Sequence, residues 1–357
     1  MPIKVGAGSI TMPYKKAYVG NNIVYSSSTP TPTPRTITYY GIAPVMSNKR
    51  AGGDARAFKG YGVFAGGFKA LWDCNDSVDL YDATLTKSSA PALDTARYEL
   101  QGATTGNYLL FGGGSARNTK YSTVDAYDST FTKVNVSALS TARTAHGSLS
   151  IGNYALFCGG EPQLSSVEAY DNTLTKTIAT SLPKAPWQFG QNGTSIGNYA
   201  ILAGGYAQSG RITDVVTYNT SLTRSTAQSL STGTSGLASS STDTYAMFGG
   251  GATSSGKSKK VHAYNSSLIQ STTELSVGTE WGMSASVRDY VVFASGEPAT
   301  AVAQSVDNSL TMTVLTSLSN SKGHAQACSI GDYLLFAGGC TGWNGTYYDN
   351  VDVYKVS

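Results

Sequence analysis

The chain repeats one stretch of sequence, whose clearest copy is TARTAHGSLSIGNYALFCGG (residues 141–160) followed by SVEAYDNTLTK (residues 166–176). The core of the stretch is a phenylalanine or leucine, and a pair of small residues, usually two glycines, begins two positions later. So regular a repeat predicts an array of similar structural units within one domain, although 357 residues alone would suggest two or so domains. The core residue recurs seven times, 43 to 47 residues apart: Phe64, Phe111, Phe157, Leu202, Phe248, Phe293 and Phe336.

Each copy contains the signals of four short strands. The first is rich in small residues, and the second starts at a tyrosine that follows a turn, as in Gly152-Asn153-Tyr154. A second tyrosine, usually followed by Asp or Asn as in Tyr170-Asp171, precedes a further turn, although the sixth copy has Val306-Asp307 there. Four-stranded sheets repeated every ~40–50 residues predict a β-propeller, here one with seven blades.

The two ends of the chain indicate how the ring closes. Residues 36–43 read as a strand that lacks the three strands expected ahead of it, and the last copy, ending at Ser357, lacks its fourth strand. If residues 36–43 complete the last blade, the first and last repeats are joined and an exposed sheet edge is removed. We therefore expect residues 36–357 to form an all-β, seven-bladed propeller closed by an N-terminal strand.

Composition agrees with an all-β fold and argues against several kinds of partner. Charged residues make up 13% of the chain, about half of the usual fraction. The net charge of +3 is too balanced to predict nucleic-acid binding, and Lys257, Lys259 and Lys260 read as a solvated loop. No segment reads as a signal peptide or membrane span. The four cysteines lack metal-type spacing, so we expect reduced thiols and assembly in the cytoplasm.

The repeats resemble those of Kelch proteins. The glycine pair after an apolar strand, the Tyr-Asp pair and a Leu-x-x-x-Arg segment before the first strand carry the resemblance. The Kelch tryptophan between Tyr-Asp and the next repeat is missing in every copy. The resemblance implies a protein-interaction platform over residues 36–357. The arginine position holds, in six copies, Arg50, Arg97, Arg143, Thr234, Thr279 and Lys322.

The first 28 residues are a different kind of segment. The run KKAYVGNNIVY, residues 15–25, is similar to short N-terminal segments of bacteriophage tail proteins, particularly from Gram-positive hosts. Residues 17–19 and 23–25 predict a β-hairpin, which is too small to fold alone. Residues 29–35, a Thr/Pro run, read as a stiff linker. The hairpin is expected to dock on other virion or tail proteins through Tyr18, Val19, Ile23, Val24 and Tyr25.

The alternative for this segment is a loose tail or a strand that pads the propeller. The phage resemblance implies a virion protein without a signal peptide. Any multiple copies would be set by the symmetry of the particle.

Strand order places the variable loops on one face of the propeller. The loops after the glycine pairs and the blade-to-blade connections gather there, and variable loops on a constant scaffold commonly carry function. Exposed aromatic side chains stack well on sugar rings or protein partners, although each tryptophan could instead pack a loop onto its own blade. The candidate ligand-binding residues are Trp72, Trp187, Trp281, Trp343, Tyr121, Tyr206, Tyr347 and Tyr348.

The sequence does not predict a catalytic or metal centre. Galactose oxidase has a Kelch-type propeller, but a copper site requires converging histidine and tyrosine ligands. The three histidines are expected in strands of different blades: His146, His262 and His324. A glycosidase requires two carboxylates in one pocket. The glutamates of the variable face are expected to be partly two or more blades apart: Glu161, Glu280 and Glu297.

We therefore predict a non-enzymatic phage virion component, in the tail, baseplate or fibre, without cofactor or metal. Its propeller would bind a host-surface glycan or protein, and neither nucleic acid nor membrane insertion is expected. The alternatives are a purely structural virion decoration or a cytoplasmic Kelch-type adaptor. A glycan-active enzyme is the least favoured interpretation.

Overall fold

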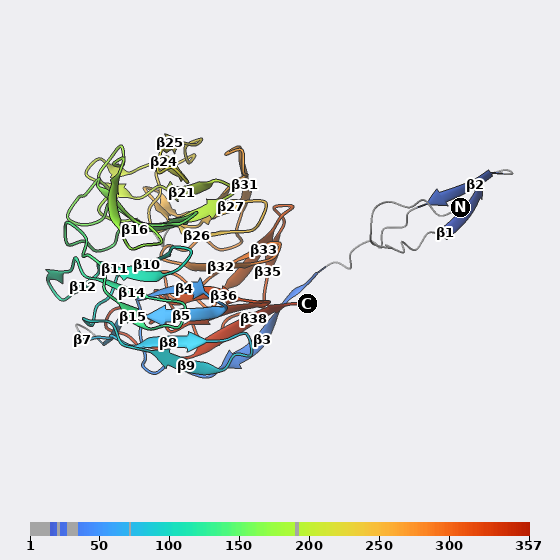
Figure 1. The fold of residues 1–357 in the computed structure, drawn as a ribbon. Coiled ribbons are helices and arrows are strands. Elements are labelled where there is room, and N and C mark those ends of the chain that lie inside the picture. Colours follow the sequence, from blue (N-terminus) through green and yellow to red (C-terminus); the bar gives the residue numbers. More distant parts are fainter. Residues whose placement is uncertain (1–14, 20–21, 27–34, 71–72, 190–192) are drawn as a thin grey trace. The chain divides into compact units, whose positions relative to one another are not determined.

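The computed structural model describes the chain except residues 1–14, 20–21, 27–34, 71–72 and 190–192, and for residues 15–19 and 22–26 it describes the backbone (Figure 1). Two units are distinguished, Met1–Thr36 and Ile37–Ser357. In the first unit, β1 (Lys15–Val19) and β2 (Asn22–Ser26) pair antiparallel as a hairpin, as predicted for this stretch. The part of the chain that the structure describes contains no helix that could cross a membrane.

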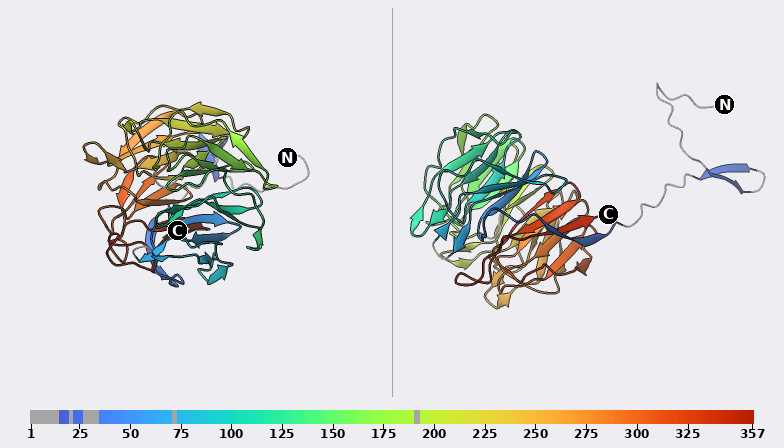
Figure 2. Two further views of the ribbon diagram at one scale, coloured as in Figure 1. Left: turned by 90° about the vertical axis from the view of Figure 1, so that its left-hand side faces the viewer. Right: turned by 90° about the horizontal axis from the view of Figure 1, so that it is seen from below.

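Residues 37–357 form an all-β propeller of seven four-stranded sheets, which confirms the fold predicted from the repeats. Figure 2 shows the blades arranged around a common axis. The first strands of successive blades are neighbours around that axis, so they form the inner ring of the propeller.

The strands of blades 1 to 3 are β4 (Asp54–Phe58), β5 (Tyr61–Ala65), β8 (Val78–Tyr81), β9 (Lys87–Ala90); β10 (Gln101–Thr104), β11 (Leu109–Gly112), β14 (Val124–Tyr127), β15 (Lys133–Val134); β16 (Gly147–Ile151), β17 (Tyr154–Cys158), β18 (Val167–Tyr170) and β19 (Lys176–Ala179). Those of blades 4 to 6 are β20 (Thr194–Ile196), β21 (Tyr199–Ala203), β24 (Val215–Asn219), β25 (Arg224–Thr226); β26 (Ala238–Ser241), β27 (Ala246–Gly249), β30 (Lys260–Tyr264), β31 (Gln270–Glu274); β32 (Met283–Val287), β33 (Tyr290–Ala294), β34 (Ala303–Asp307) and β35 (Met312–Val314). Four blades also carry a two-stranded ribbon after the glycine pair: β6 (Phe68–Ala70) with β7 (Asp73–Cys74), β12 (Ser115–Ala116) with β13 (Thr119–Lys120), β22 (Tyr206–Ala207) with β23 (Gly210–Arg211), and β28 (Ala252–Thr253) with β29 (Gly256–Lys257).

Blade 7 closes the ring with strands from both ends of the propeller. Its order is β36 (Gln326–Ile330), β37 (Tyr333–Ala337), β38 (Val351–Val356) and β3 (Ile37–Ala43). Figure 1 shows the blue β3 beside the red β38, and the register runs from Ile37 opposite Val356 to Ala43 opposite Val351. The predicted closure through the N-terminal strand is therefore present.

The second tyrosine of the repeat fastens a blade to the connection that enters it. In blade 3 the Tyr170 ring meets the Phe157 ring edge-on, with 6.0 Å between the centroids. Its hydroxyl donates to the carbonyl of Ser137, at 2.8 Å. The tyrosine thus fills the blade core and also satisfies a carbonyl of the incoming connection. The same type of hydrogen bond to a residue 36 to 38 positions earlier is made by Tyr81, Tyr127, Tyr218, Tyr264 and Tyr354.

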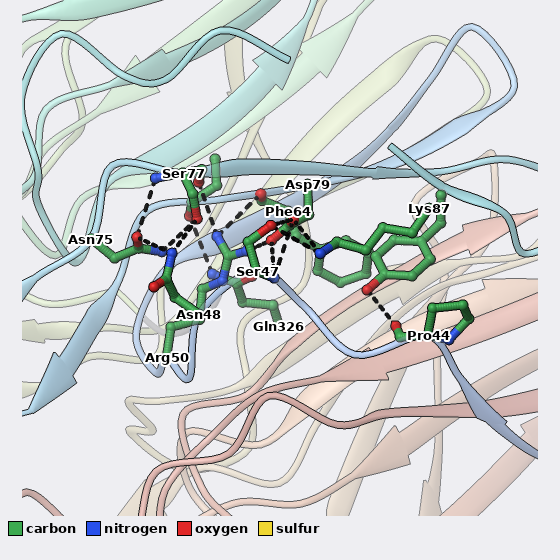
Figure 3. Close-up of polar contacts among 12 residues, drawn as sticks. Pro44, Ser47, Asn48, Arg50, Phe64, Asn75, Ser77, Asp79, Lys87 and Gln326 are labelled. Carbon is green, nitrogen blue, oxygen red and sulfur yellow. Dashed lines mark hydrogen bonds and ion pairs between the residues drawn. The ribbon is translucent and has the colours of Figure 1, made fainter. Parts of the chain in front are cut away.

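Four blades contain a buried ion pair between the first connection and the third strand. The cation occupies the arginine position of the repeat, and the carboxylate lies opposite the core phenylalanine of the second strand. The nitrogen–oxygen distances in blades 2, 3 and 7 are 2.7, 2.7 and 2.8 Å, and Figure 3 shows the pair of blade 1. At most 1% of any of these side chains is exposed, for the pairs Arg50–Asp79, Arg97–Asp125, Arg143–Glu168 and Lys322–Asp352.

The carboxylate of each pair also holds the incoming connection. In blade 2 the backbone N–H of Asp94 donates to Asp125 Oδ1 at 2.8 Å, and in blade 7 that of Ser319 donates to Asp352 Oδ1 at 2.8 Å. Figure 3 shows the same arrangement in blade 1, where Ser47 and Lys87 also contact Asp79. The acid therefore ties the connection, the second strand and the third strand into one unit.

In the other three blades, both members of the pair are replaced together. The cation position holds Trp187, Thr234 or Thr279, and the position opposite the core residue holds, respectively, Val216, His262 or Gln304. A buried charge without its partner is strongly unfavourable, so a blade keeps both charges or neither. In blade 6 the amide oxygen of Gln304 accepts the N–H groups of Ser276 and Val277, which preserves the contact without a charge.

Lys322→Met should destabilise the propeller by about 3–5 kcal/mol, because it leaves the Asp352 carboxylate buried without its cation. Lys322→Met combined with Asp352→Asn should recover at least half of that loss, since the amide can still accept the Ser319 N–H. Urea unfolding of the wild type and both variants measures these free energies. Equal destabilisation by the single and double variants would contradict the account of charge pairing.

Candidate functional site

A cavity of about 590 Å³ opens on the propeller axis. Its axial position follows from its lining, because every blade contributes at least one residue. The contributing residues lie just before the first strand of a blade, or in the loop after the glycine pair. One lining residue from each blade, in order, is Gly52, Glu99, Ala145, Gln188, Lys257, Glu280 and His324.

A ring of backbone hydrogen bonds shapes this end of the axis. The residue that precedes the inner strand donates its N–H to the carbonyl of its equivalent in the preceding blade. Four such bonds, of 2.7 to 3.1 Å, are Gly52 to His324, Glu99 to Gly52, Phe189 to Ala145 and Trp281 to Gly236.

Several of these residues adopt a left-handed backbone conformation. Glu99, Trp281 and His324 have φ of 52°, 53° and 51°, which is uncommon for residues other than glycine. Such conformations persist where the surroundings over-determine them, and they concentrate at functional sites. Here the hydrogen-bonded ring holds the backbone, and all three residues line the cavity.

The loop after the glycine pair is joined to the connection in every blade by an isolated β-bridge. In blade 6 the bridge links Glu280 and Glu297, whose backbones exchange hydrogen bonds of 3.1 and 2.6 Å. The bridges therefore bring the variable loops to the rim of the axial cavity. They also place two glutamates of one blade beside each other.

Trp343 forms an aromatic platform on the cavity wall. The Phe68 ring stacks on it, with 4.7 Å between centroids and 19° between planes. The Tyr98 ring meets it edge-on at 6.3 Å, and the His324 ring lies 5.4 Å away. The Tyr347 hydroxyl donates to the Trp343 carbonyl at 2.6 Å. Trp343 is held on several sides, yet 45% of it stays exposed, as a preformed ligand platform requires.

The aromatic wall continues through His324 to Trp281. The Trp281 and His324 rings stack with 6.0 Å between their centroids. Burial lowers the pKa of His324 to about 4, so its imidazole is neutral at neutral pH. Its Nε2 lies 3.5 Å from Glu297 Oε1.

Three carboxyl groups line the cavity in different surroundings. Glu280 pairs with Lys257. Burial raises the pKa of Glu297, and the Glu280 charge adds to the rise while Lys257 opposes it. Burial also raises the pKa of Glu99, although the Thr144 hydroxyl, which donates to Glu99 Oε2 at 2.9 Å, acts in the other direction.

The structure brings two of the predicted ligand-binding residues together at the cavity, Trp281 and Trp343. Trp187 and Tyr206 form a separate stack, 5.3 Å between centroids, and the Arg211 guanidinium lies 5.4 Å from the Tyr206 ring. Tyr121 and Tyr348 are partly exposed.

Two predicted ligand-binding residues need separate comment. Contrary to the expectation of an exposed side chain, Tyr347 is buried, and it supports Trp343 from within the loop. Trp72 lies outside the described residues. The side chains of the docking candidates also lie outside them: Tyr18, Val19, Ile23, Val24 and Tyr25.

Four expectations about the polar residues need correction. Lys257 was expected in a solvated loop, but it lines the cavity and pairs with Glu280. Glu280 and Glu297 were expected to lie too far apart for one pocket, but the β-bridge of blade 6 brings both to it. His324 was expected within an inner strand, but it precedes β36 and faces the cavity.

The repeat itself carried the signal that would have found these residues. When the copies are aligned on the arginine position, Glu99 and His324 fall two residues beyond it, at the entrance to the inner strand. Trp281 falls two residues beyond the equivalent Thr279. Side chains at one repeat position in a ring must meet at the axis.

His146 and His262 are structural. Both are buried, in blades 3 and 5, and His146 precedes β16 instead of lying within a strand as expected. Neither ring nitrogen of His146 has a hydrogen-bond partner among the described residues, and burial lowers its pKa well below the ordinary value. No three His, Cys, Asp or Glu side chains of the described part of the chain are grouped so that they could hold a metal ion.

His146→Leu should stabilise the protein by about 1 kcal/mol at neutral pH, because it removes two unsatisfied buried polar atoms. Leu100 and Leu237 occupy the equivalent positions of blades 2 and 5. The gain should grow as the pH falls below about 6.5, because the unfolded histidine then binds a proton that the buried one refuses. Urea unfolding at two pH values measures it. A pH-independent gain, or a loss, would contradict this reading of His146.

Comparison with known proteins supports the fold. No family model matches the sequence, and no curated protein matches it. Among solved structures, the protein YjhT is similar to this chain with a TM-score of 0.57 and 16% sequence identity. The match covers 77% of this chain and 99% of YjhT. The likeness is one of fold alone. The Kelch assignment and the phage resemblance stay predictions.

Proposed function

We propose that this protein is a non-enzymatic phage virion component whose Kelch-like propeller binds a host-surface glycan in the axial cavity. The observation that carries the proposal is the Trp343 platform, which is partly exposed and fixed by Phe68, Tyr98 and the Tyr347 hydroxyl. Sugar rings present C–H faces that stack on such aromatic surfaces.

The polar lining of the cavity suits the hydroxyl groups of a sugar. Glu99, Glu297, Gln101 and Gln188 place carboxylate and amide groups around the same space as Trp343. A few polar groups on an otherwise aromatic wall are typical of pockets that orient a small ligand. The cavity volume of about 590 Å³ falls within the range of small-ligand sites and suits a short segment of a glycan chain.

Trp343→Ala should weaken glycan binding by roughly tenfold or more, since it removes the stacking surface at the centre of the site. Trp187→Ala is the matched control, because this tryptophan stacks with Tyr206 away from Trp343. A glycan array probed with the full chain, followed by calorimetry on the best glycan, measures both effects. Equal loss in the two variants would contradict the axial site, as would binding that survives Trp343→Ala.

A glycan hydrolase is the second candidate, and one observation favours it. Glu280 and Glu297 are neighbours in different surroundings, with Glu280 paired to Lys257 and the pKa of Glu297 raised by burial. Unequal carboxylates of this kind can serve as base and acid. The same calorimetry samples separate the two functions, because a binding module leaves the bound glycan intact and a hydrolase shortens it.

The virion assignment rests on residues 1–28 and their resemblance to phage tail segments. The unit Met1–Thr36 is distinct from the propeller, and its described part is a single two-stranded hairpin. An isolated two-stranded hairpin is marginally stable in water, which favours docking on another protein. Other virion or tail proteins are the proposed partners.

A chain that begins at residue 29 should melt at the same temperature as the full chain, because it keeps β3 and the closed ring. It should nevertheless fail to enter virions when it replaces the full chain during assembly. Immunoblotting of purified particles measures incorporation. Normal incorporation of the shortened chain would contradict the docking role and would favour the cytoplasmic adaptor.

A further inference from the structure

The axial cavity has an uncompensated negative charge. Its described ionisable lining residues are three glutamates, one lysine and His324. The lysine, Lys257, is already paired with Glu280. His324 is neutral at neutral pH because burial lowers its pKa to about 4. Glu99 and Glu297 thus face the cavity without a cation from the lining.

The surroundings of these two glutamates do not supply that cation. Glu99 receives one hydrogen bond, from the neutral hydroxyl of Thr144. The nearest group reported for Glu297 is the neutral His324 ring, at 3.5 Å. Farther out on the rim, Lys120 pairs with Glu161 at 3.1 Å. The cations of the blade interiors are buried in pairs with their own acids.

The aromatic wall adds an attraction of the same sign. Trp281 and Trp343 both line the cavity and flank His324. The faces of indole rings attract ammonium groups, tryptophan most strongly among the aromatic residues. Contacts link Glu297 to His324 and His324 to Trp343, so a sugar ring stacked on Trp343 lies within reach of the Glu297 carboxylate.

We infer that the glycan bound in the axial cavity carries a free, protonated amino group, which Glu297 and Glu99 recognise beside the tryptophan platform. The inference rests on the proposed glycan-binding function and specifies its ligand class. An ammonium group donates charge-assisted hydrogen bonds to a carboxylate, whereas an acetylated amine lacks the charge. A uronate or phosphate would meet like charge in the same place.

The test compares sugars that differ in this group alone. The full chain is titrated at about pH 6, where an alkyl amine is protonated, with tetramers of glucosamine and of N-acetylglucosamine. The corresponding galactosamine pair is titrated in parallel, together with a tetramer of galacturonate. The free-amine form of at least one pair should bind roughly tenfold tighter than its acetylated form, as expected for one charge-assisted hydrogen bond. The preference should shrink as salt is added.

Variants assign the preference to the cavity. Glu297→Gln and Glu99→Gln should each reduce the ratio of free-amine to acetylated affinity, with Glu297 expected to matter more because it is nearer to Trp343. Glu274→Gln is the matched control, since Glu274 is exposed on the outer strand β31, and it should keep the full ratio. Melting temperatures check that every variant is folded.

The remaining outcomes separate this inference from the proposed function. If acetylated and free-amine sugars bind equally and Trp343→Ala abolishes both, the amine inference fails and glycan binding stands. Binding of galacturonate alone overturns the inference in the same way. A preference for free amines that survives both glutamate variants also overturns it. If no tetramer binds and a glycan array is blank, the inference and the proposed function fail together.

Discussion

A charge buried in a blade must have its partner in the same blade, and much of the propeller is organised around that constraint. Arg97 and Asp125 in blade 2, like Lys322 and Asp352 in blade 7, are fully buried and sit 2.7 and 2.8 Å apart. The acid also accepts an N–H from the incoming connection, so one side chain fixes the path between blades. Where the cation is lost, the acid is lost too, as Thr279 and Gln304 show. Continuum reasoning on buried ions predicts this pairing, because half of a pair is worse than none.

The site follows from the same connections. Each one ends at the entrance of an inner strand, where backbone hydrogen bonds pass from blade to blade around the axis. The chain turns there through left-handed residues, which include Glu99, Trp281 and His324. A ring of similar blades would give seven similar residues at the axis. Divergence at this one repeat position, with the β-bridged loops beside it, turns a structural ring into a cavity with distinct walls.

The sequence predicts the fold well because the repeat is read locally. Tyrosines, glycine pairs and turn residues specify each blade, and the unpaired strand at residues 36–43 has one place to go. Small residues on the inner strands are explained as well, since Ser148 and Ser150 bond the exposed edge of the neighbouring strand at Gly102 and Thr104. The site was harder to predict because it depends on distances across the ring. Glu280 and Glu297 are 17 positions apart and meet through a two-residue bridge, which no strand pattern indicates. Tyr347 looked like a surface aromatic, but it is buried beneath Trp343.

The difference between blade interior and axis also accounts for the character of the cavity. Inside the blades every buried acid is matched, so the interior is electrically closed. At the axis Lys257 matches Glu280, while Glu99 and Glu297 keep a neutral hydroxyl and a neutral imidazole as neighbours. Carboxylates left in that state raise the free energy of the empty cavity, because burial without a cation disfavours their charged form. A ligand that supplies the cation removes this cost on binding, and one that supplies an anion increases it. The unmatched charges of the cavity therefore act as a filter on the ligand, which a fully matched lining could not provide.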